Sequence, residues 1–401
     1  MENPPPDFSA RLAALGHVLI RVGVNLRVGQ RLLIAEPHEL QGVAREAAPL
    51  VDAARRAAQA AGASGVSVTW GDPVRLRQLV GTRNWPSLRR EIAANTAVLR
   101  DHVDRGDALL FLQSSHLDLM RGVPAGDANE FRHLVWEHFG PVAQELTAGA
   151  TNWCVSAAPV PAWADFAYAE LPAPLRLDAL WTDLFDSMRV SEVDPIGSWA
   201  AHLQALRERA ETLNRWPTHT RRLVGGGTDL TVGLPEEHRW CTACLTTRSG
   251  HPFVANLPTE EIFTAPHRDS AHGMVRVSRP INFGGTVIDG IELEFRRGRV
   301  IAASARQGTD HLQRLLETDE GAARLGEIAL VPGETALGRT RRLFFNPLLD
   351  ENATSHVALG EGYAFCLRSP NPSALNRSLI HVDLPVAIDP EKTGVGSLGD
   401  R

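Results

Sequence analysis

The N-terminal half of the sequence alternates short apolar runs with longer helical patterns, and this alternation most strongly constrains the fold. Apolar runs typical of buried strands lie at 31–35, 66–70, 108–112 and 152–156. Patterns with helical spacing lie at 9–22, 43–61, 85–104, 128–147 and 198–214. Strands separated by helices of this length form a parallel sheet that helices cover. The first half is therefore predicted to be an α/β domain.

The pattern changes after Trp216-Pro217, where the apolar segments become short and turn residues become frequent. Antiparallel strands are predicted at 218–234, 274–281, 286–295 and 299–304, with a turn at Gly284-Gly285 and one helix at 308–325. We therefore expect two domains, an α/β domain at 1–217 and an α+β domain of mostly antiparallel strands at 218–401.

Composition excludes several classes of protein. The net charge of -6 gives no electrostatic footprint for nucleic acid. The single lysine, Lys392, argues against a lysine Schiff base, a Ser-Lys dyad and a Walker lysine. The sequence has no apolar run of about 18 residues, and its first residues lack the pattern of a signal peptide, so we expect no membrane contact and a cytoplasmic location.

The four cysteines, Cys154, Cys241, Cys244 and Cys366, are too few for a disulfide scaffold in a chain of 401 residues. Cys241 and Cys244 form a single C-x-x-C without a second pair, so no structural zinc site is predicted. Two interpretations remain, a redox pair and two buried apolar side chains, and the second is the more common.

Residues that could bind a metal gather in the last third of the chain. Side chains of a strand alternate between its faces, so a strand at 378–384 would place Ile380, Val382 and Leu384 in a core. His381 and Asp383 would then lie side by side on the other face. Imidazole nitrogen and carboxylate oxygen both bind divalent metals. A pair on a solvated face is the alternative.

Three further segments carry carboxylates or a histidine. Glu327 interrupts an apolar run at 325–331, where it must be paired, metal-bound or solvent-facing. Glu351 and His356 lie in 350–356, and Tyr363 follows them. Glu260 and Glu261 lie between a Pro-Thr turn and an apolar pair. By contrast, Glu292 and Glu294 alternate with apolar residues and are predicted to face solvent.

These segments, in order, resemble the aminopeptidase T family of thermophilic two-metal metallopeptidases. The resemblance rests on NLPTEEIFTAPHR (256–268), LGEIALV (325–331), DENATSHVALGEGYAF (350–365) and NRSLIHVD (376–383). The segments GVNLRVGQRLLI (23–34) and GGGTDLTVGL (225–234) are also similar to that family. The chain departs from the family pattern in Leu384-Pro385-Val386 and in a short stretch between Tyr363 and His381.

The resemblance implies a cytoplasmic, dimeric aminopeptidase that acts on peptides with a free N-terminus. It implies two divalent ions, zinc or cobalt with manganese as a further candidate, bound in the C-terminal domain. The implied ligands are Glu261, Glu327, His356, His381 and Asp383. Glu260 is the alternative to Glu261, or an anchor for the substrate's amino group. Glu351 would be the general base and Tyr363 would stabilise the oxyanion.

Other hypotheses remain at this stage. The altered segment at 364–386 allows a relative that acts on a different small amide, or a binding protein that has lost catalysis. The α/β N-terminal half alone would also suit a dinucleotide-dependent oxidoreductase, but the glycine fingerprint of such enzymes is absent.

Overall fold

The computed structural model describes residues 8–215, 218–283, 286–369, 371 and 373–388. Its contacts group the chain into two compact units: Met1–Leu203 with Ala243–Thr259, and Gln204–Thr242 with Glu260–Arg401. The domain boundary expected at 217–218 stays a prediction, since residues 216–217 lie outside the described part of the chain. The compact units differ from the predicted domains, because residues 204–217 group with the second unit and residues 243–259 with the first.

The first unit is built on a parallel sheet, as the strand–helix alternation predicts. The sheet contains β1 (Arg31–Ala35), β2 (Gly65–Val68), β3 (Ala108–Gln113), β4 (Trp153–Ala157) and β9 (Asn256–Leu257). Their order is β2-β1-β3-β4-β9, and every neighbouring pair is parallel. Strand β9 has two residues and was not predicted.

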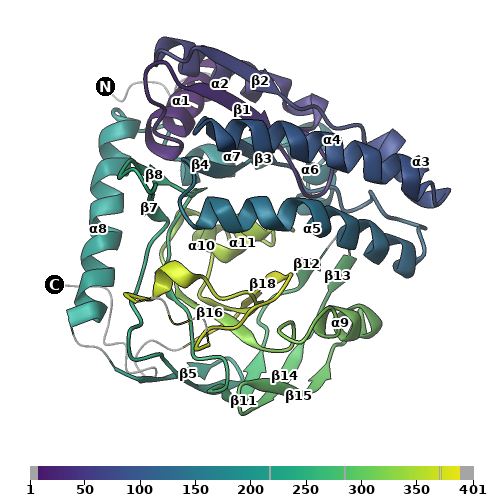
Figure 1. Cartoon of the computed structure of the whole chain (residues 1–401), viewed down its shortest axis with the longest axis vertical. Helices are drawn as coiled ribbons and strands as arrows, with labels where there is room; N and C mark the ends of the chain where they lie inside the picture. The colour runs from purple at the N-terminus through teal and green to yellow at the C-terminus, as the bar shows by residue number, and fades with distance from the viewer. Residues whose placement is uncertain (1–7, 216–217, 284–285, 370, 372, 389–401) are drawn as a thin grey trace. The chain divides into compact units, whose positions relative to one another are not determined.

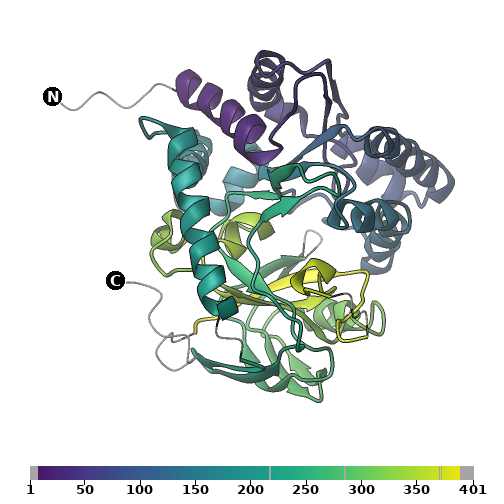
Figure 2. The same cartoon turned by 60° about the vertical axis from the view of Figure 1, so that its left-hand side comes forward.

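Helices cover both faces of this sheet. The first face is covered by α1 (Phe8–Val18) and α2 (Ala48–Ala60), and the second by α4 (Trp85–Asp104) and α5 (Ala125–Thr147) (Figure 1). Figure 2 shows the two helix pairs on opposite sides of the strands. The strand order reverses at β1, so right-handed crossovers place α2 and α4 on different faces. The core on the second face contains Leu33, Leu109 and Phe139.

The first unit contains further elements. These are η1 (Leu19–Gly23), η2 (Arg45–Ala47), α3 (Pro73–Gly81), α6 (Pro161–Ala167), α7 (Ala173–Ser187) and the hairpin of β7 (Cys244–Thr246) and β8 (Pro252–Val254). Helix α8 (Pro195–Arg215) begins in this unit. The helices α3, α6 and α7 were not predicted. No helix in the described part of the chain combines the length and apolarity needed to cross a membrane.

The second unit contains two antiparallel sheets. One has the order β10-β16-β17-β18, formed by Ile262–Thr264, Leu325–Leu330, His356–Gly360 and His381–Pro385. The other has the order β15-β14-β11-β6-β5, formed by Arg299–Ser304, Glu292–Arg296, His272–Arg276, Thr228–Gly233 and Thr220–Gly225. A hairpin of β12 (Ile281–Phe283) and β13 (Thr286–Ile288) accompanies them. The turn expected at Gly284-Gly285 lies outside the described residues. The expected fold class, α/β followed by mostly antiparallel α+β, is confirmed.

The remaining elements of this unit are α9 (Thr309–Leu316), α10 (Ala336–Thr340), α11 (Pro347–Glu351) and η3 (Ala364–Cys366). The helix predicted at 308–325 is therefore too long. It ends at Leu316, and the Asp319 carboxylate then accepts hydrogen bonds from the backbone N–H groups of Gly321 and Ala322. This turn replaces the last helical turns because it satisfies the same backbone donors.

The β10–β18 sheet turns one apolar face toward the core of this unit. Ile328, Val357, Val382 and Leu384 lie in a core together with Leu230, Val275 and Leu293 of the other sheet, among other residues. The alternation predicted for 378–384 is thereby confirmed, and His381 and Asp383 point to the opposite face. That face carries the candidate site.

Candidate metal centre

Glu327 lies in the middle of β16, a strand whose six side chains are all buried. Glu327 is 4 % exposed, and its neighbour across the sheet on β17 is Ala358. The pairing of β16 with β17 shifts register between Leu325 and Glu327. A carboxylate buried this deeply costs free energy unless cations or hydrogen-bond donors surround it.

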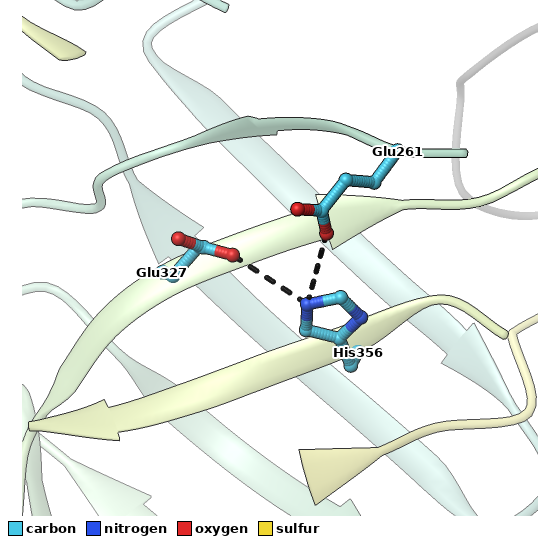
Figure 3. Close-up of side chains that lie close together, drawn as sticks. All are labelled: Glu261, Glu327 and His356. Atoms are coloured by element: carbon cyan, nitrogen blue, oxygen red, sulfur yellow. Dashed lines mark ion pairs between the residues drawn. The ribbon is translucent and has the colours of Figure 1, made fainter. Parts of the chain in front are cut away.

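Two histidines face Glu327, one toward each of its oxygens. His356 Nε2 lies 3.5 Å from Glu327 Oε1 and 3.2 Å from Glu261 Oε2 (Figure 3). His381 Nε2 lies 3.8 Å from Glu327 Oε2 and 3.4 Å from Asp383 Oδ1. Two groups of potential ligand atoms result, Glu261–Glu327–His356 and Glu327–His381–Asp383, each with its atoms within 4.8 Å of one another. Glu327 belongs to both groups.

Backbone carbonyls orient both imidazoles. His381 Nδ1 lies 2.9 Å from the carbonyl oxygen of Glu361, and His356 Nδ1 lies 3.3 Å from that of Thr354. A carbonyl oxygen only accepts, so the hydrogen of a neutral ring is assigned to Nδ1. The Nε2 lone pair then points toward the carboxylates, as it does in metal-binding histidines.

The cluster carries an excess of negative charge. Burial lowers the pKa of His356, but the adjacent carboxylates of Glu261 and Glu327 outweigh this and hold its pKa well above the ordinary value. Burial also lowers the pKa of His381, but the charge of Asp383 outweighs it, and the pKa is raised to about 9. Burial raises the pKa of Glu261. The site therefore stabilises positive charge on both imidazoles.

The donor set fits divalent cations. Carboxylate oxygens and imidazole nitrogens are the ligands of zinc and similar ions. Glu261 Oε2 is buried and has no hydrogen bond among the described residues, although it lies beside His356. Cations in the two groups would give this oxygen a partner and balance the charge that protonated histidines otherwise balance.

Glu351 lies beside this cluster at the C-terminal end of α11. Pro347 begins this helix, and the Asn346 side chain caps it by accepting from Leu349 N–H. Burial, followed by the charges of Asp383 and Glu261, raises the pKa of Glu351 well above its ordinary value. Its carboxyl group is thus held among other carboxylates, where a proton is easily taken up.

Tyr363 covers the other side of His381. The two rings stack with centroids 4.9 Å apart, and Tyr363 also stacks on Phe365 at 5.2 Å. Burial, and then the charge of Glu327, raises the pKa of the Tyr363 hydroxyl well above its ordinary value. The hydroxyl therefore remains a hydrogen-bond donor at neutral pH.

All seven residues expected from the sequence thus gather in one unit, and Glu261 rather than Glu260 lies beside His356. The sequence did not reveal the role of Asn352, which is fully buried. Its Nδ2 donates to Glu351 Oε1 (3.3 Å) and to the carbonyl of Leu348 (2.8 Å), and its Oδ1 accepts from Glu260 N–H (2.6 Å). Asn352 therefore joins the segment of Glu261 to Glu351.

Ala358 was also missed. It lies on the central strand β17 with Glu327 on one side and Asp383 on the other. Residues paired across neighbouring strands share a face of the sheet, so the Ala358 side chain projects to the same side as both carboxylates and, being small, takes up little room there. The spacing of Ala358 and Gly360, at alternate positions after His356, is a sequence signal that could have indicated this.

The chain is similar to known proteins in both sequence and structure. The sequence profile described as "Thermophilic metalloprotease (M29)" matches residues 8–396. Aminopeptidase T of Thermus thermophilus is 36 % identical over 385 residues, which cover 94 % of this chain and 92 % of the relative. Aminopeptidase AmpS of Bacillus subtilis is 31 % identical over 398 residues, covering 95 % and 93 %. The solved structure "Wild-type AmpT from Thermus thermophilus" superposes with a TM-score of 0.86 at 35 % identity, covering 95 % and 94 %.

Proposed function

The chain belongs to the M29 family of thermophilic metalloproteases, and on this premise we propose that it is an aminopeptidase that uses two divalent ions. Membership confirms the resemblance found in the sequence and makes the chain a peptide-bond hydrolase that depends on metal ions. The observation that supports two ions is Glu327, whose oxygens face two different histidines in two ligand groups. A carboxylate shared in this way is typical of two-metal hydrolases.

The proposed ligands of the two ions come from both groups. They are Glu261, Glu327, His356, His381 and Asp383. Bound there, the ions would act as Lewis acids and lower the pKa of water toward neutrality. Their positive charge would also favour the ionised form of Glu351, whose pKa is raised in the presence of the neighbouring carboxylates alone.

Glu351 is the proposed general base, because it lies beside the ligands without belonging to either ligand group. It would take a proton from the attacking water and later give one to the leaving amine. The Tyr363 hydroxyl is the proposed donor to the developing oxyanion, since stacking on His381 holds it beside the ligands. Glu260, which is 5 % exposed, stays our candidate to hold the substrate's ammonium group.

Several finer features are proposed from family resemblance. They are zinc or cobalt as the ions, with manganese as a third candidate, a homodimer, and a cytoplasmic location. The alternatives, a relative that acts on another small amide and a binding protein without catalysis, gain no support. The residues proposed as ligands, base and oxyanion donor lie together, which a protein that had lost catalysis would have no need to retain.

The proposal is tested by stripping the purified protein with a chelator and restoring zinc, cobalt or manganese separately. The assay compares aminoacyl p-nitroanilides with their N-acetylated forms. Turnover that returns with metal and requires a free amino group is the expected result. Absence of turnover with two ions bound per chain would instead indicate that the substrate is a different amide. Absence of turnover without bound metal would indicate a binding protein.

Glu351→Gln separates the base from the ligands. This variant is expected to keep its metal content and to lose turnover by roughly 100- to 10,000-fold, because only the proton transfer is removed. Metal analysis and kcat on the best p-nitroanilide are the two measurements. Near-normal turnover would show that another group is the base.

A further inference from the structure

Two cysteines that are far apart in the sequence meet beside the metal centre. The side chains of Cys241 and Cys366 pack in one small cluster, and each thiol acts on the pKa of the other. Both residues belong to a small cluster that contains Phe263 and Tyr363. Cys241 is half-buried, whereas Cys366 is 1 % exposed. The C-x-x-C motif is therefore not the thiol pair of this unit, since Cys244 belongs to the other compact unit.

The backbone holds these two thiols in register. The N–H of Cys241 donates to the carbonyl of Phe263 (2.8 Å), and the N–H of Phe263 donates back (3.0 Å). The carbonyl of Cys366 accepts from Arg239 N–H (2.8 Å), two residues before Cys241. The Cys241 thiol also donates to the carbonyl of Phe365 at 3.6 Å. Backbone hydrogen bonds thus hold the segment of Cys241 between the strand of Phe263 and the turn of Cys366.

We propose that Cys241 and Cys366 form a reversible oxidation site, at which a peroxide converts the two thiols into a disulfide. Cys241 is the residue that peroxide reaches, because it is the more exposed of the pair. The same order follows from the chemistry. The neighbouring Cys366 thiol lowers the pKa of Cys241, with the charge of Arg239 acting in the same direction, whereas burial raises the pKa of Cys366.

The reaction balances with hydrogen peroxide as the only co-reactant. The sulfur of Cys241 attacks one peroxide oxygen, the O–O bond breaks, and a sulfenic acid and one water form. The sulfur of Cys366 then attacks the sulfenic sulfur, the S–O bond breaks, and a second water leaves. Two thiols are oxidised and one peroxide is reduced to two waters.

The disulfide would act on the metal centre through its two flanking segments. Cys241 pairs with Phe263, which lies two residues after Glu261. The N–H of Cys366 donates to the carbonyl of Tyr363 (3.0 Å) within η3. A covalent bond brings the sulfurs closer than packing contact does, so it must draw the turn that begins at Tyr363 toward the strand of Phe263. Misplacing a catalytic group by about 1 Å can cost up to roughly 100-fold in rate.

The experiment uses the full metal-loaded chain and hydrogen peroxide at low excess, with non-reducing peptide mapping and intact mass as readouts. The wild type is expected to lose two hydrogen atoms and to yield one peptide pair that joins Cys241 to Cys366. Cys244→Ser is the matched control and should give the same linkage. Cys366→Ala should give instead an unlinked sulfenic acid at Cys241, which dimedone traps. A reductant should reverse the linkage in the wild type.

Three results would overturn the proposal: a linkage of Cys241 to Cys244, overoxidation of Cys241 in the wild type without any linkage, or no change in either thiol. Turnover of the oxidised wild type is measured in parallel, and this arm rests on the proposed function. We expect a loss of roughly 10- to 100-fold that reduction restores and that Cys241→Ser does not show. Since the mass readout does not need turnover, a protein inactive in both states would refute the proposed function and leave the thiol result standing.

Discussion

Replacing Ala358 with valine would test whether the space between Glu327 and Asp383 belongs to the metal ions. Ala358 is fully buried, and both carboxylates are its direct neighbours across the sheet. Side chains paired in this way have their Cβ atoms about 4.5–5.5 Å apart. The two added methyl groups must therefore enter the space into which the carboxylates project.

The magnitude follows from two sets of distances. A ligand oxygen or nitrogen lies about 2.0–2.2 Å from a bound ion. A carbon atom needs about 3.5–4.0 Å from its neighbours. The methyl groups and an ion bound to Glu327 thus exclude each other unless the ligands move. We expect Ala358→Val to weaken metal binding by roughly 10- to 100-fold and to cost about 1–3 kcal/mol of stability through overpacking.

Competition with a chromogenic chelator measures the affinity, and denaturant unfolding measures the stability. Ala302→Val is the matched control, because Ala302 is exposed on β15 of the other sheet of the same unit. Ala358→Gly, which only enlarges the space, should keep the affinity within a few-fold. The reasoning is refuted if folded Ala358→Val binds metal as tightly as Ala302→Val.

Three other expectations concern Asn352, the two histidines and Glu39. Asn352→Ala removes the acceptor of Glu260 N–H and the donor to Glu351, so it should cost about 1–3 kcal/mol in unfolding free energy and lower kcat more than it changes KM; unchanged kcat would contradict a positioning role. Metal binding to the stripped protein at pH 7.5 should release at least two protons, since the pKa of His381 is about 9, that of His356 is also raised, and the ions would favour the ionised form of Glu351 as well. Affinity should accordingly fall as pH falls below about 9, and calorimetry in buffers of different ionisation enthalpy would show it, whereas heats independent of the buffer would contradict it. Burial raises the pKa of half-buried Glu39 to about 7, with Glu36 as the next cause. A carboxyl group with a raised pKa stabilises the fold at pH values below its ordinary pKa, and this contribution is lost as the pH rises through about 7. Between pH 5 and pH 8 the wild type should therefore lose at most about 3 kcal/mol more unfolding free energy than Glu39→Gln. Unfolding midpoints that change in parallel for the two proteins would disprove it.

Much of the fold could be predicted because its determinants are local. The helix at 85–104 and the strands near 31–35 and 108–112 follow from periodicity and flanking turns, and the structure has α4, β1 and β3 there. Strand β9 could not be predicted this way, since its two residues form a strand only by pairing with β4. The end of α9 depends on Asp319, a side chain that competes for backbone donors beyond the helix.

The sequence by itself determined which side chains are candidate metal ligands. Alternation in 378–384 was sufficient to place His381 and Asp383 on one face, and burial of a run around Glu327 was sufficient to require a partner for its charge. Only the tertiary structure decided which partner each atom has. It directed the two oxygens of Glu327 to different histidines, placed Glu261 rather than Glu260 beside His356, and packed Cys366 and Cys241 into one cluster. These contacts join segments far apart in the chain, so they depend on strand order and register, which local periodicity does not encode.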